Sequence, residues 1–312
     1  MTKVFIDGSA GTTGLRIYER LSDRADLQLL TLSEELRKDT SARAEQINNA
    51  DIVFLCLPDA AAIEAVSLAQ NPNTAIIDTS TAHRTADGWV YGMPELTGMR
   101  EKIAASKRIA NPGCHASGFV SLVAPLVSAG IIPADTALTS FSITGYSGGG
   151  KKMIADYEDE NADIALSAPR QYGLTQNHKH LKEMVKICGL ETTPVFCPVV
   201  SNFYSGMEVT VPLFAKDIKG SAKDICELYR SIYNGPIIKF VDADDESGFL
   251  TANRLSNFDD MFITVSGNED RILLVARFDN LGKGASGAAI QNMNILLGLP
   301  EQTGLNIHGG NI

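Results

Sequence analysis

The sequence lacks the long apolar runs that membrane proteins carry. No stretch approaches the ~20 apolar residues needed to cross a bilayer. The segment Met1-Thr2-Lys3 leads directly into the strand-like Val4-Phe5-Ile6, which is not the charged, apolar and small-residue order of a signal peptide. We therefore expect a cytoplasmic protein without a membrane partner.

Basic residues are also fewer than acidic ones. The 27 Lys and Arg against 37 Asp and Glu give a net charge of -10, which repels phosphate backbones over long range. Nucleic acid is therefore not an expected partner. The content of 44% hydrophobic and 21% charged residues is typical of a globular enzyme. A length of 312 residues exceeds what one hydrophobic core usually fills, which predicts two domains.

Cysteine is sparse and is not arranged for cross-linking. The five cysteines are widely spaced and odd in number: Cys56, Cys114, Cys188, Cys197 and Cys226. This pattern does not fit the disulfide framework of a small secreted protein. We expect most of them to be buried thiols in a reducing compartment.

The first third of the chain alternates between short apolar runs and helical patterns. Strands are predicted at 3–6, 27–32, 51–57, 74–78 and 108–110, with helices at 12–21, 42–49 and 60–69. This alternation predicts an α/β domain with a doubly wound parallel sheet buried on both faces.

The pattern changes after Asn111. Longer, more widely spaced strands are predicted, among them 138–144, 207–214 and 273–278, with helices at 116–128, 180–188, 221–233 and 286–297. We expect a second, α+β domain with a mixed, mainly antiparallel sheet and helices on one face.

A glycine-rich loop follows the first predicted strand and opens the first helix. It comprises Gly8, Ser9, Ala10, Gly11, Thr12, Thr13 and Gly14. The G-x-x-G-x-x-G spacing is not the commoner G-x-G-x-x-G, and a tight strand-to-helix turn would also explain it. The order of strand, loop, helix and strand favours a dinucleotide site, with the pyrophosphate on the helix N–H groups.

The end of the second predicted strand bears on the choice of cofactor. Ser33 follows it, and the basic pair Arg37 and Lys38 comes shortly after. A hydroxyl with nearby cations suits the 2′-phosphate of NADP better than the 2′-hydroxyl of NAD. Glu34 and Glu35 argue in the opposite direction, and a solvated surface loop is the alternative. We expect NADP.

Cys114 follows an Asn-Pro-Gly turn and precedes an apolar helical run. This places it at a helix N-terminus, where unpaired N–H groups and the helix dipole favour the nucleophilic thiolate. A small residue packed at a helix start is the alternative. That reading suits Cys56, which lies in an apolar strand.

A thiolate nucleophile needs a group that moves protons, and His178 and His180 are candidates. Both precede a predicted helix, close to Tyr172 and Glu183. Two alternatives stay open: a metal site completed by Cys188 or Cys197, and surface histidines at a polar helix start. The cysteines lack paired CxxC spacing, so we expect no metal.

Five ordered motifs together resemble the N-acetyl-γ-glutamyl-phosphate reductase family in its shorter form, within the group that includes aspartate-semialdehyde dehydrogenase. They span nearly the whole chain: Gly8 to Gly14, Asn111 to Cys114, Ser147 to Lys151, His178 to Glu183 and Asp279 to Gly287. Lys182, Gly149 and Lys151 depart from residues that are common in the family pattern.

The resemblance implies a Rossmann-type NADP-binding domain (1–113 and 285–312) and a glyceraldehyde-phosphate-dehydrogenase-like catalytic and dimerisation domain (114–284). It also implies a homodimer or homotetramer, a small acyl-phosphate substrate and a role in arginine biosynthesis. The expected reaction is NADPH-dependent reduction of N-acetyl-L-glutamyl 5-phosphate to N-acetyl-L-glutamate 5-semialdehyde and phosphate, through a thioester.

By the same resemblance Cys114 is the nucleophile and His178 the acid–base residue. Tyr172, His180 and Glu183 would contact substrate, and the last helix would return to the cofactor with Gly284, Ala285 and Asn292. Arg84 follows a strand and is a candidate for binding a substrate carboxylate or phosphate, with a surface arginine as the alternative.

Two other functions stay open from the sequence. One is a non-catalytic dinucleotide sensor, which needs the glycine loop but no thiol at a helix start. The other is a reductase of a related acyl phosphate, either aspartyl phosphate or a carrier-bound aminoacyl phosphate.

Overall fold

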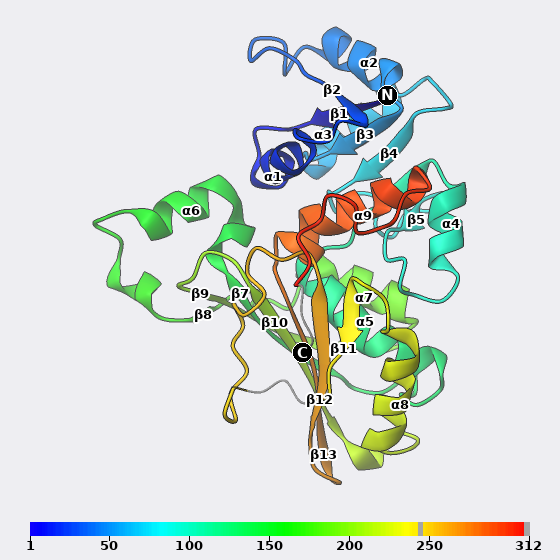
Figure 1. Ribbon diagram of the computed structural model, residues 1–312. Coiled ribbons are helices and arrows are strands. Elements are labelled where there is room, and N and C mark those ends of the chain that lie inside the picture. The colour runs from blue at the N-terminus through cyan, green and yellow to red at the C-terminus, as the bar shows by residue number, and fades with distance from the viewer. Residues whose placement is uncertain (243–245, 309–312) are drawn as a thin grey trace. The chain divides into compact units, whose positions relative to one another are not determined.

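The computed structural model describes residues 1–242 and 246–308. The chain divides into two compact units. The first holds Met1–Gly113 and Ala285–Leu305, and the second holds Cys114–Gly284 together with the described tail residues 306–308. Each unit has its own sheet and its own helices (Figure 1).

The first unit is built on a six-stranded parallel sheet in the order β2-β1-β3-β4-β6-β5. Its strands are β1 (Thr2–Asp7), β2 (Leu27–Leu30), β3 (Ile52–Leu55), β4 (Ala75–Asp78), β5 (Val90–Tyr91) and β6 (Arg108–Ala110). This Rossmann-like sheet confirms the prediction made from the alternation of strands and helices. The two-residue β5 was not predicted.

Helices cover both faces of this sheet. One face packs against residues of α1 (Thr12–Leu21), α4 (Met99–Ala105) and α9 (Gly287–Leu296). The other packs against residues of α2 (Thr40–Asn49) and α3 (Asp59–Leu68). All four residues of β3 are buried for this reason, which explains why the strand is continuously apolar.

The strand order reverses between β1 and β3. Open α/β sheets bind ligands outside the carboxyl ends of the strands at such a reversal. Gly8 follows β1 there, and Cys56 follows β3. The predicted glycine loop therefore lies where this fold class places a dinucleotide.

The second unit is built on a mixed sheet of seven strands in the order β11-β12-β13-β10-β7-β9-β8. β11 pairs with β12 and β7 with β9 in parallel, and the other neighbours pair antiparallel. The strands are β7 (Thr139–Gly145), β8 (Arg170–Gln171), β9 (Val195–Ser201), β10 (Met207–Phe214), β11 (Ile238–Phe240), β12 (Met261–Gly267) and β13 (Arg271–Phe278). The mixed, mainly antiparallel prediction is confirmed.

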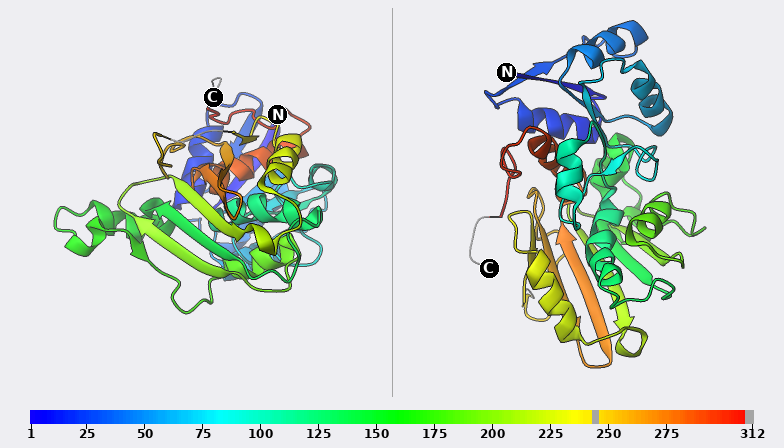
Figure 2. Two further views of the ribbon diagram at one scale, coloured as in Figure 1. Left: turned by 90° about the horizontal axis from the view of Figure 1, so that it is seen from below. Right: turned by 90° about the vertical axis from the view of Figure 1, so that its right-hand side faces the viewer.

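Three helices lie on one face of this sheet: α5 (Cys114–Ser128), α7 (His180–Cys188) and α8 (Ala222–Ile232) (Figures 1 and 2). α5 sits directly against the strands, because a Cβ at Gly118 would lie 2.5 Å from the side chain of Val209 on β10. The helix is buried along most of its length, which matches its apolar sequence.

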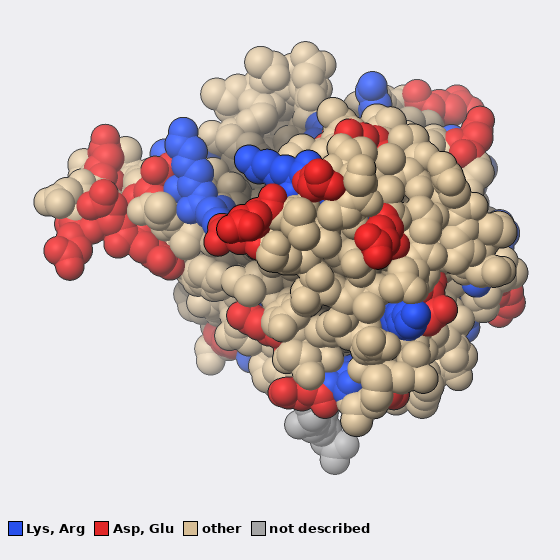
Figure 3. Space-filling model, turned by 90° about the horizontal axis from the view of Figure 1, so that it is seen from above, with Lys and Arg blue, Asp and Glu red and all other residues tan. Residues whose placement is uncertain are grey.

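Within the second unit, α6 (Gly150–Glu158) stands away from the sheet (Figure 1 and the left view of Figure 2). Acidic side chains gather on this lobe, at the left of Figure 3. The end of this helix and the segment that follows it are rich in exposed acids: Glu158, Asp159, Glu160 and Asp163. In 1–242 and 246–308 no helix is long and apolar enough to span a bilayer.

The tail corrects the expected domain boundary. We expected 285–312 to belong to the first domain, but 306–308 join the second unit. The Asp259 N–H donates to the carbonyl oxygen of Asn306 at 2.7 Å, and the Asn306 N–H donates to Asp259 Oδ2 at 2.8 Å. The backbone N–H of His308 donates to Asp260 at 3.2 Å. These bonds hold the tail beside β12.

Candidate active site

The glycine loop is shaped by close approaches of the backbone. Gly8 has a φ of +89°, and a Cβ there would lie 2.3 Å from the carbonyl oxygen of Cys56. A Cβ at Gly14 would lie 2.4 Å from the Gly8 oxygen. Gly11 is the N-cap of α1 and supplies no side-chain cap, so the first N–H groups of the helix are available to phosphate oxygens. These residues fit a dinucleotide pyrophosphate.

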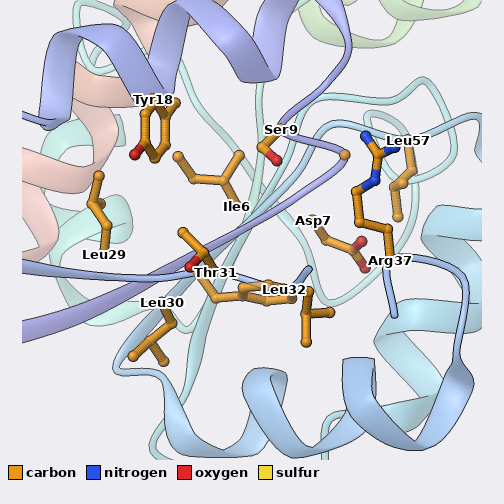
Figure 4. A pocket seen from close by; sticks show the side chains of 12 residues that line it. Ile6, Asp7, Ser9, Tyr18, Leu29, Leu30, Thr31, Leu32, Arg37 and Leu57 are labelled. Carbon is orange, nitrogen blue, oxygen red and sulfur yellow. The ribbon is translucent and has the colours of Figure 1, made fainter. Parts of the chain in front are cut away.

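A pocket lies between the glycine loop and the end of β2 (Figure 4). Ser9, Thr31 and Arg37 supply polar atoms to its lining, and Tyr18 and Leu57 are among its other members. The Arg37 guanidinium is paired with the Glu34 carboxylate. Ser33 is exposed and is not among the lining residues, so its contact with the cofactor stays a prediction.

Asp7 also lines this pocket, and the sequence reasoning did not single it out. Its Oδ2 accepts hydrogen bonds from Nε and Nη2 of Arg43 at 3.0 and 2.9 Å, and both side chains are buried. Burial raises the pKa of Asp7, against the opposing effect of Arg43. Arg43 also pairs with Glu64. The only sequence signal was an acid directly at the end of β1 beside the glycines.

Cys114 is the first residue of α5, as the turn before it predicted. No acidic residue lies in the first turn to oppose a negative charge. Gly284 packs against it, since a Cβ there would lie 3.0 Å from the Cβ of Cys114. Cys114 is half-buried. Burial raises the pKa of the Cys56 thiol to about 12 and raises that of Cys188 as well, which makes both poor nucleophiles.

Three of the predicted residues meet in a cluster of rings in the second unit. The ring centroids of His178 and His180 lie 4.7 Å apart, and those of Tyr172 and His178 lie 6.1 Å apart. Phe196 of β9 packs against His178 at 5.1 Å. Burial raises the pKa of Tyr172, and the charge of Cys114 adds to the effect.

His115 belongs to the same cluster and was missed from the sequence. Its Nδ1 lies 2.7 Å from Ser142 Oγ, and its Nε2 lies 2.6 Å from the Tyr172 hydroxyl. Burial lowers the pKa of His115 to about 3, helped by the charge of His178. The imidazole is therefore neutral. The available signal was a histidine inside an otherwise apolar helix, beside the candidate nucleophile.

His180 and one further predicted residue, Glu183, are buried in the first turn of α7. The alternative of surface histidines does not hold for His180, which is 6% exposed. In the described part of the chain, no group of three His, Cys, Asp or Glu side chains could hold a metal ion.

Arg84 lies in the first unit and is buried, at 9% exposed, so the surface-arginine alternative is wrong. Its Nε donates to the Asn111 carbonyl oxygen and its Nη2 to that of Thr79, each at 2.9 Å. Arg84 thus holds the strand that runs into the Pro112-Gly113 turn. A contact with substrate stays a prediction.

Asn292 and Ala285 are also tied into the first unit. The side-chain amide of Asn111 donates to the Ala285 carbonyl oxygen at 2.9 Å. The Asn292 amide donates to the Gly92 carbonyl oxygen at 2.9 Å and to the Asn111 side chain at 3.2 Å. These bonds join the start of α9 to the end of β6, and cofactor contacts of both residues stay predictions.

Two family models match the chain, one for each half of the expected architecture. The model described as semialdehyde dehydrogenase, NAD binding domain, matches residues 3–106. The model described as semialdehyde dehydrogenase, dimerisation domain, matches residues 114–280.

Curated relatives match over nearly the full length. The chain is 45% identical to an N-acetyl-gamma-glutamyl-phosphate reductase of Trichormus variabilis, covering 97% of this chain and 99% of that protein. It is 46% identical to the protein of that name from Brucella suis, covering 95% and 99%. A solved structure of aspartate semialdehyde dehydrogenase II from Vibrio cholerae shares the fold, with a TM-score of 0.71 at 18% identity over 95% of this chain and 98% of that one.

Proposed function

The chain belongs to the N-acetyl-γ-glutamyl-phosphate reductase family, and we propose that it reduces N-acetyl-L-glutamyl 5-phosphate to N-acetyl-L-glutamate 5-semialdehyde in arginine biosynthesis. Full-length identity of 45% to a reductase of that name supports the substrate. The observation that carries the chemistry is the thiol of Cys114 at the start of α5, next to Tyr172.

Cys114 is the nucleophile in this proposal. Its thiolate attacks the acyl carbon, and the tetrahedral oxyanion collapses by breaking the bond to phosphate, which leaves with the bonding electrons. The acyl group is then a thioester on the sulfur. Backbone N–H groups at the start of α5 are suited to stabilise the oxyanion, because four of them lack partners inside the helix.

When bound, the reduced dinucleotide supplies one hydride to the thioester carbon. The hemithioacetal oxyanion so formed re-forms its carbonyl and expels the Cys114 thiolate, releasing the aldehyde. His178 serves as the acid–base residue that gives and takes the proton on that oxygen. Tyr172, His180 and Glu183 serve as substrate contacts around it.

Substitution separates the two candidate acid–base histidines. His178→Asn keeps a polar side chain of similar size but cannot carry the proton, so the pH dependence of kcat should flatten. An unchanged profile would assign the role to His180, and His180→Asn is the matched variant.

Features of the first unit's pocket support NADP rather than NAD. NAD enzymes place an acid near the ribose 2′-hydroxyl. Here Thr31 and Leu32 follow β2 in the lining in place of an acid, and Arg37 supplies a cation to it. A 2′-phosphate would compete with Glu34 for that guanidinium.

A homodimer or homotetramer is the proposed assembly. The sheet face opposite α5 carries exposed apolar side chains on four strands: Phe141, Val195, Phe214 and Leu273. A second copy of the chain is the proposed partner, because the family model that matches this unit is a dimerisation domain. Light scattering of wild type and Phe141→Asp tests this, and an unchanged mass for the variant would contradict it.

One assay tests the reaction and its substrate together. Purified protein with NADP and inorganic phosphate is expected to form NADPH when N-acetylglutamate semialdehyde is added. Free glutamate semialdehyde and aspartate semialdehyde should react at least about 100-fold less efficiently, because polar groups meant for the N-acetyl group then stay unpaired. Equal rates with aspartate semialdehyde would instead assign the protein as a reductase of aspartyl phosphate. If none of the aldehydes led to NADPH formation, a non-catalytic dinucleotide sensor would be favoured.

A further inference from the structure

A buried ion pair lies at the dinucleotide pocket of the first unit. Asp7, the last residue of β1, lines this pocket together with Arg37 (Figure 4). Its Oδ2 accepts hydrogen bonds from Nε and Nη2 of Arg43 at 3.0 and 2.9 Å, and both side chains are buried. On its other side Arg43 donates from Nη1 to Glu64 Oε2 at 2.9 Å. The guanidinium thus joins two carboxylates, of which only Asp7 belongs to the pocket lining.

The sheet explains how these three side chains come together. Side chains two residues apart on a strand share a face, so Asp7 lies on the same face of β1 as Phe5. Phe5 packs in the core against residues of α2 and α3, the helices that carry Arg43 and Glu64. The guanidinium therefore reaches the end of β1 from α2 and is held there from α3.

Stability alone does not explain a buried ion pair at this place. Desolvation of two charges offsets much of their attraction, and apolar side chains of similar volume often stabilise a fold equally well or better. Burial raises the pKa of Asp7 in spite of Arg43, so desolvation is the larger effect on that carboxyl group. The pocket that Asp7 lines is the better explanation for the pair.

The charge of the ligand decides what the pair does in the pocket. NADP carries a 2′-phosphate on the adenosine ribose, which this fold class binds at the end of the second strand. Thr31 and Leu32 at that end line the same pocket as Asp7. An unpaired Asp7 carboxylate would repel a 2′-phosphate but not a 2′-hydroxyl. Arg43, which is not among the lining residues, cancels this charge.

We propose that the Asp7–Arg43 ion pair makes the pocket selective for NADP over NAD, because Arg43 neutralises Asp7 and so allows a 2′-phosphate to bind. The inference rests on the proposed use of NADP and adds two residues to its selectivity. Arg37 lines the pocket and attracts the phosphate directly. Arg43 acts through Asp7 and is a positioning residue.

The measurement is the ratio of the NADPH affinity to the NADH affinity, from parallel titrations of cofactor fluorescence without substrate. Arg43→Met should lower this ratio about tenfold, the order expected for one unpaired charge acting across a partly solvated pocket. Asp7→Asn removes the carboxylate charge and leaves Arg43 paired with Glu64. It should raise the ratio about threefold, since Glu64 cancels part of the released charge.

The double variant Asp7→Asn/Arg43→Met separates the effect of charge from that of structure. If charge decides, the ratio should return to within about twofold of wild type, because the pocket is again neutral. If the pair only supports the fold, both affinities should fall together in Arg43→Met and fall at least as far in the double variant. A ratio that stays low in the double variant overturns the inference, as does an unchanged ratio in Arg43→Met.

Asp7→Asn is also the variant that keeps the inference testable if Arg43→Met does not fold. Arg43→Met leaves a buried acid without its partner, whereas Asp7→Asn tests the same charge without that cost. Equal weakening of NADPH and NADH by Asp7→Asn would overturn the inference and would make Asp7 a hydrogen-bond acceptor for a ribose hydroxyl.

Arg24→Met is the matched control. The Arg24 side chain is 8% exposed, close to the 7% of Arg43, and it pairs with Asp26 at 2.6 Å. Neither Arg24 nor Asp26 lines the pocket. The ratio should therefore stay at the wild-type value, and a shift equal to that of Arg43→Met would overturn the inference in favour of a general effect of lost charge.

The proposed function can fail separately from this inference. A wild-type protein that binds NADH more tightly than NADPH would contradict the proposed cofactor, while the shifts in the variants would still decide whether the ion pair acts on the ratio. Variants that shift the ratio as expected, in a protein that reduces no acyl phosphate, would refute the proposed reaction and leave the inference standing.

Discussion

The two units present their candidate residues in opposite ways. In the first, the candidate dinucleotide loop is seven consecutive residues, Gly8 to Gly14, and its backbone N–H groups are the proposed ligands of the cofactor. In the second, the cluster around Cys114 draws on α5, β7, the segment after β8 and the start of α7. A backbone site can be recognised from a short stretch of sequence, while a side-chain site needs the tertiary fold to bring its parts together.

The largest expected effect on activity comes from substituting the candidate nucleophile of the second unit while the first unit is left unchanged. Cys114→Ser should lower kcat on the order of 10⁴-fold or more, because a serine at that position has no comparable anion at neutral pH. NADPH binding, followed by cofactor fluorescence, should stay at the wild-type affinity. Substantial activity in this variant would end the thioester mechanism, and loss of NADPH binding would show that the two functions are not separable.

The reverse experiment damages the first unit. Gly8→Ala must place a Cβ 2.3 Å from the Cys56 carbonyl oxygen at a φ of +89°. The loop should be displaced, and NADPH affinity should fall about 100-fold, since the pyrophosphate depends on loop N–H groups. Titration of cofactor fluorescence measures this, and alkylation of Cys114 should be unchanged.

Gly88→Ala is the control for Gly8→Ala. Gly88 has a φ of +80°, but a Cβ there meets nothing within 4 Å. It therefore shares the backbone strain without the collision. If both variants lost NADPH binding equally, strain in the first unit rather than the shape of the loop would be responsible.

A third prediction concerns stability and the buried imidazole of the second unit. Burial holds the pKa of His115 at about 3 in the folded state, while an unfolded histidine titrates near ~6.5. As the pH falls, the unfolded chain therefore binds this proton before the folded chain does. The free energy of unfolding is not lowered by this group above about pH 6.5, and it falls as the pH drops from 6.5 toward 3. The loss is roughly 1.4 kcal/mol per pH unit for one such group.

Urea unfolding at a series of pH values measures this effect. His115→Gln keeps a polar side chain that cannot take up the proton, so its free energy of unfolding should fall less steeply than that of wild type between pH 6 and 4. Parallel slopes would mean that another group dominates the acid response. Sequence reasoning could not have reached this prediction, because it depends on the complete burial of one side chain.

Most of the fold could be predicted, and the reasons differ between the units. The strands of the first unit are apolar throughout because both faces are covered, so they stand out as short runs between helical patterns. Cys114 at the start of α5 followed from the Asn-Pro-Gly turn. The two-residue β5 and the helix α4 carried no strong pattern, and the tail residues 306–308 are assigned by bonds to Asp259 and Asp260, which lie far away in sequence.

The site was less predictable wherever long-range partners decide a residue's role. No pattern in the sequence indicates that Arg43 forms a salt bridge with Asp7. None indicates that Arg84 donates hydrogen bonds to two backbone carbonyl oxygens. His115 was missed for the same reason, since its partners Ser142 and Tyr172 are 27 and 57 residues away. Motif reasoning located the candidate nucleophile, and only the packing located the side chains that surround it.

The smallest expected effect tests how the first unit selects its cofactor. Arg37 lines the pocket but is paired with Glu34, whose side chain is 87% exposed. An exposed ion pair is worth about 0.2–1 kcal/mol. Glu34→Gln should release the guanidinium and tighten NADPH binding up to about fivefold, with NADH unchanged, because NADH has no 2′-phosphate to use the freed cation.

Parallel titrations with NADPH and NADH measure the ratio of the two affinities. Arg37→Gln is the companion variant and should lower that ratio, and in its presence Glu34→Gln should have no further effect on it. If Glu34→Gln instead strengthens the binding of NADPH and NADH equally, the Arg37–Glu34 ion pair acts through the shape of the loop. The charge at Arg37 would then carry no selectivity for the 2′-phosphate, and the choice between NADP and NAD would depend on other residues of the pocket.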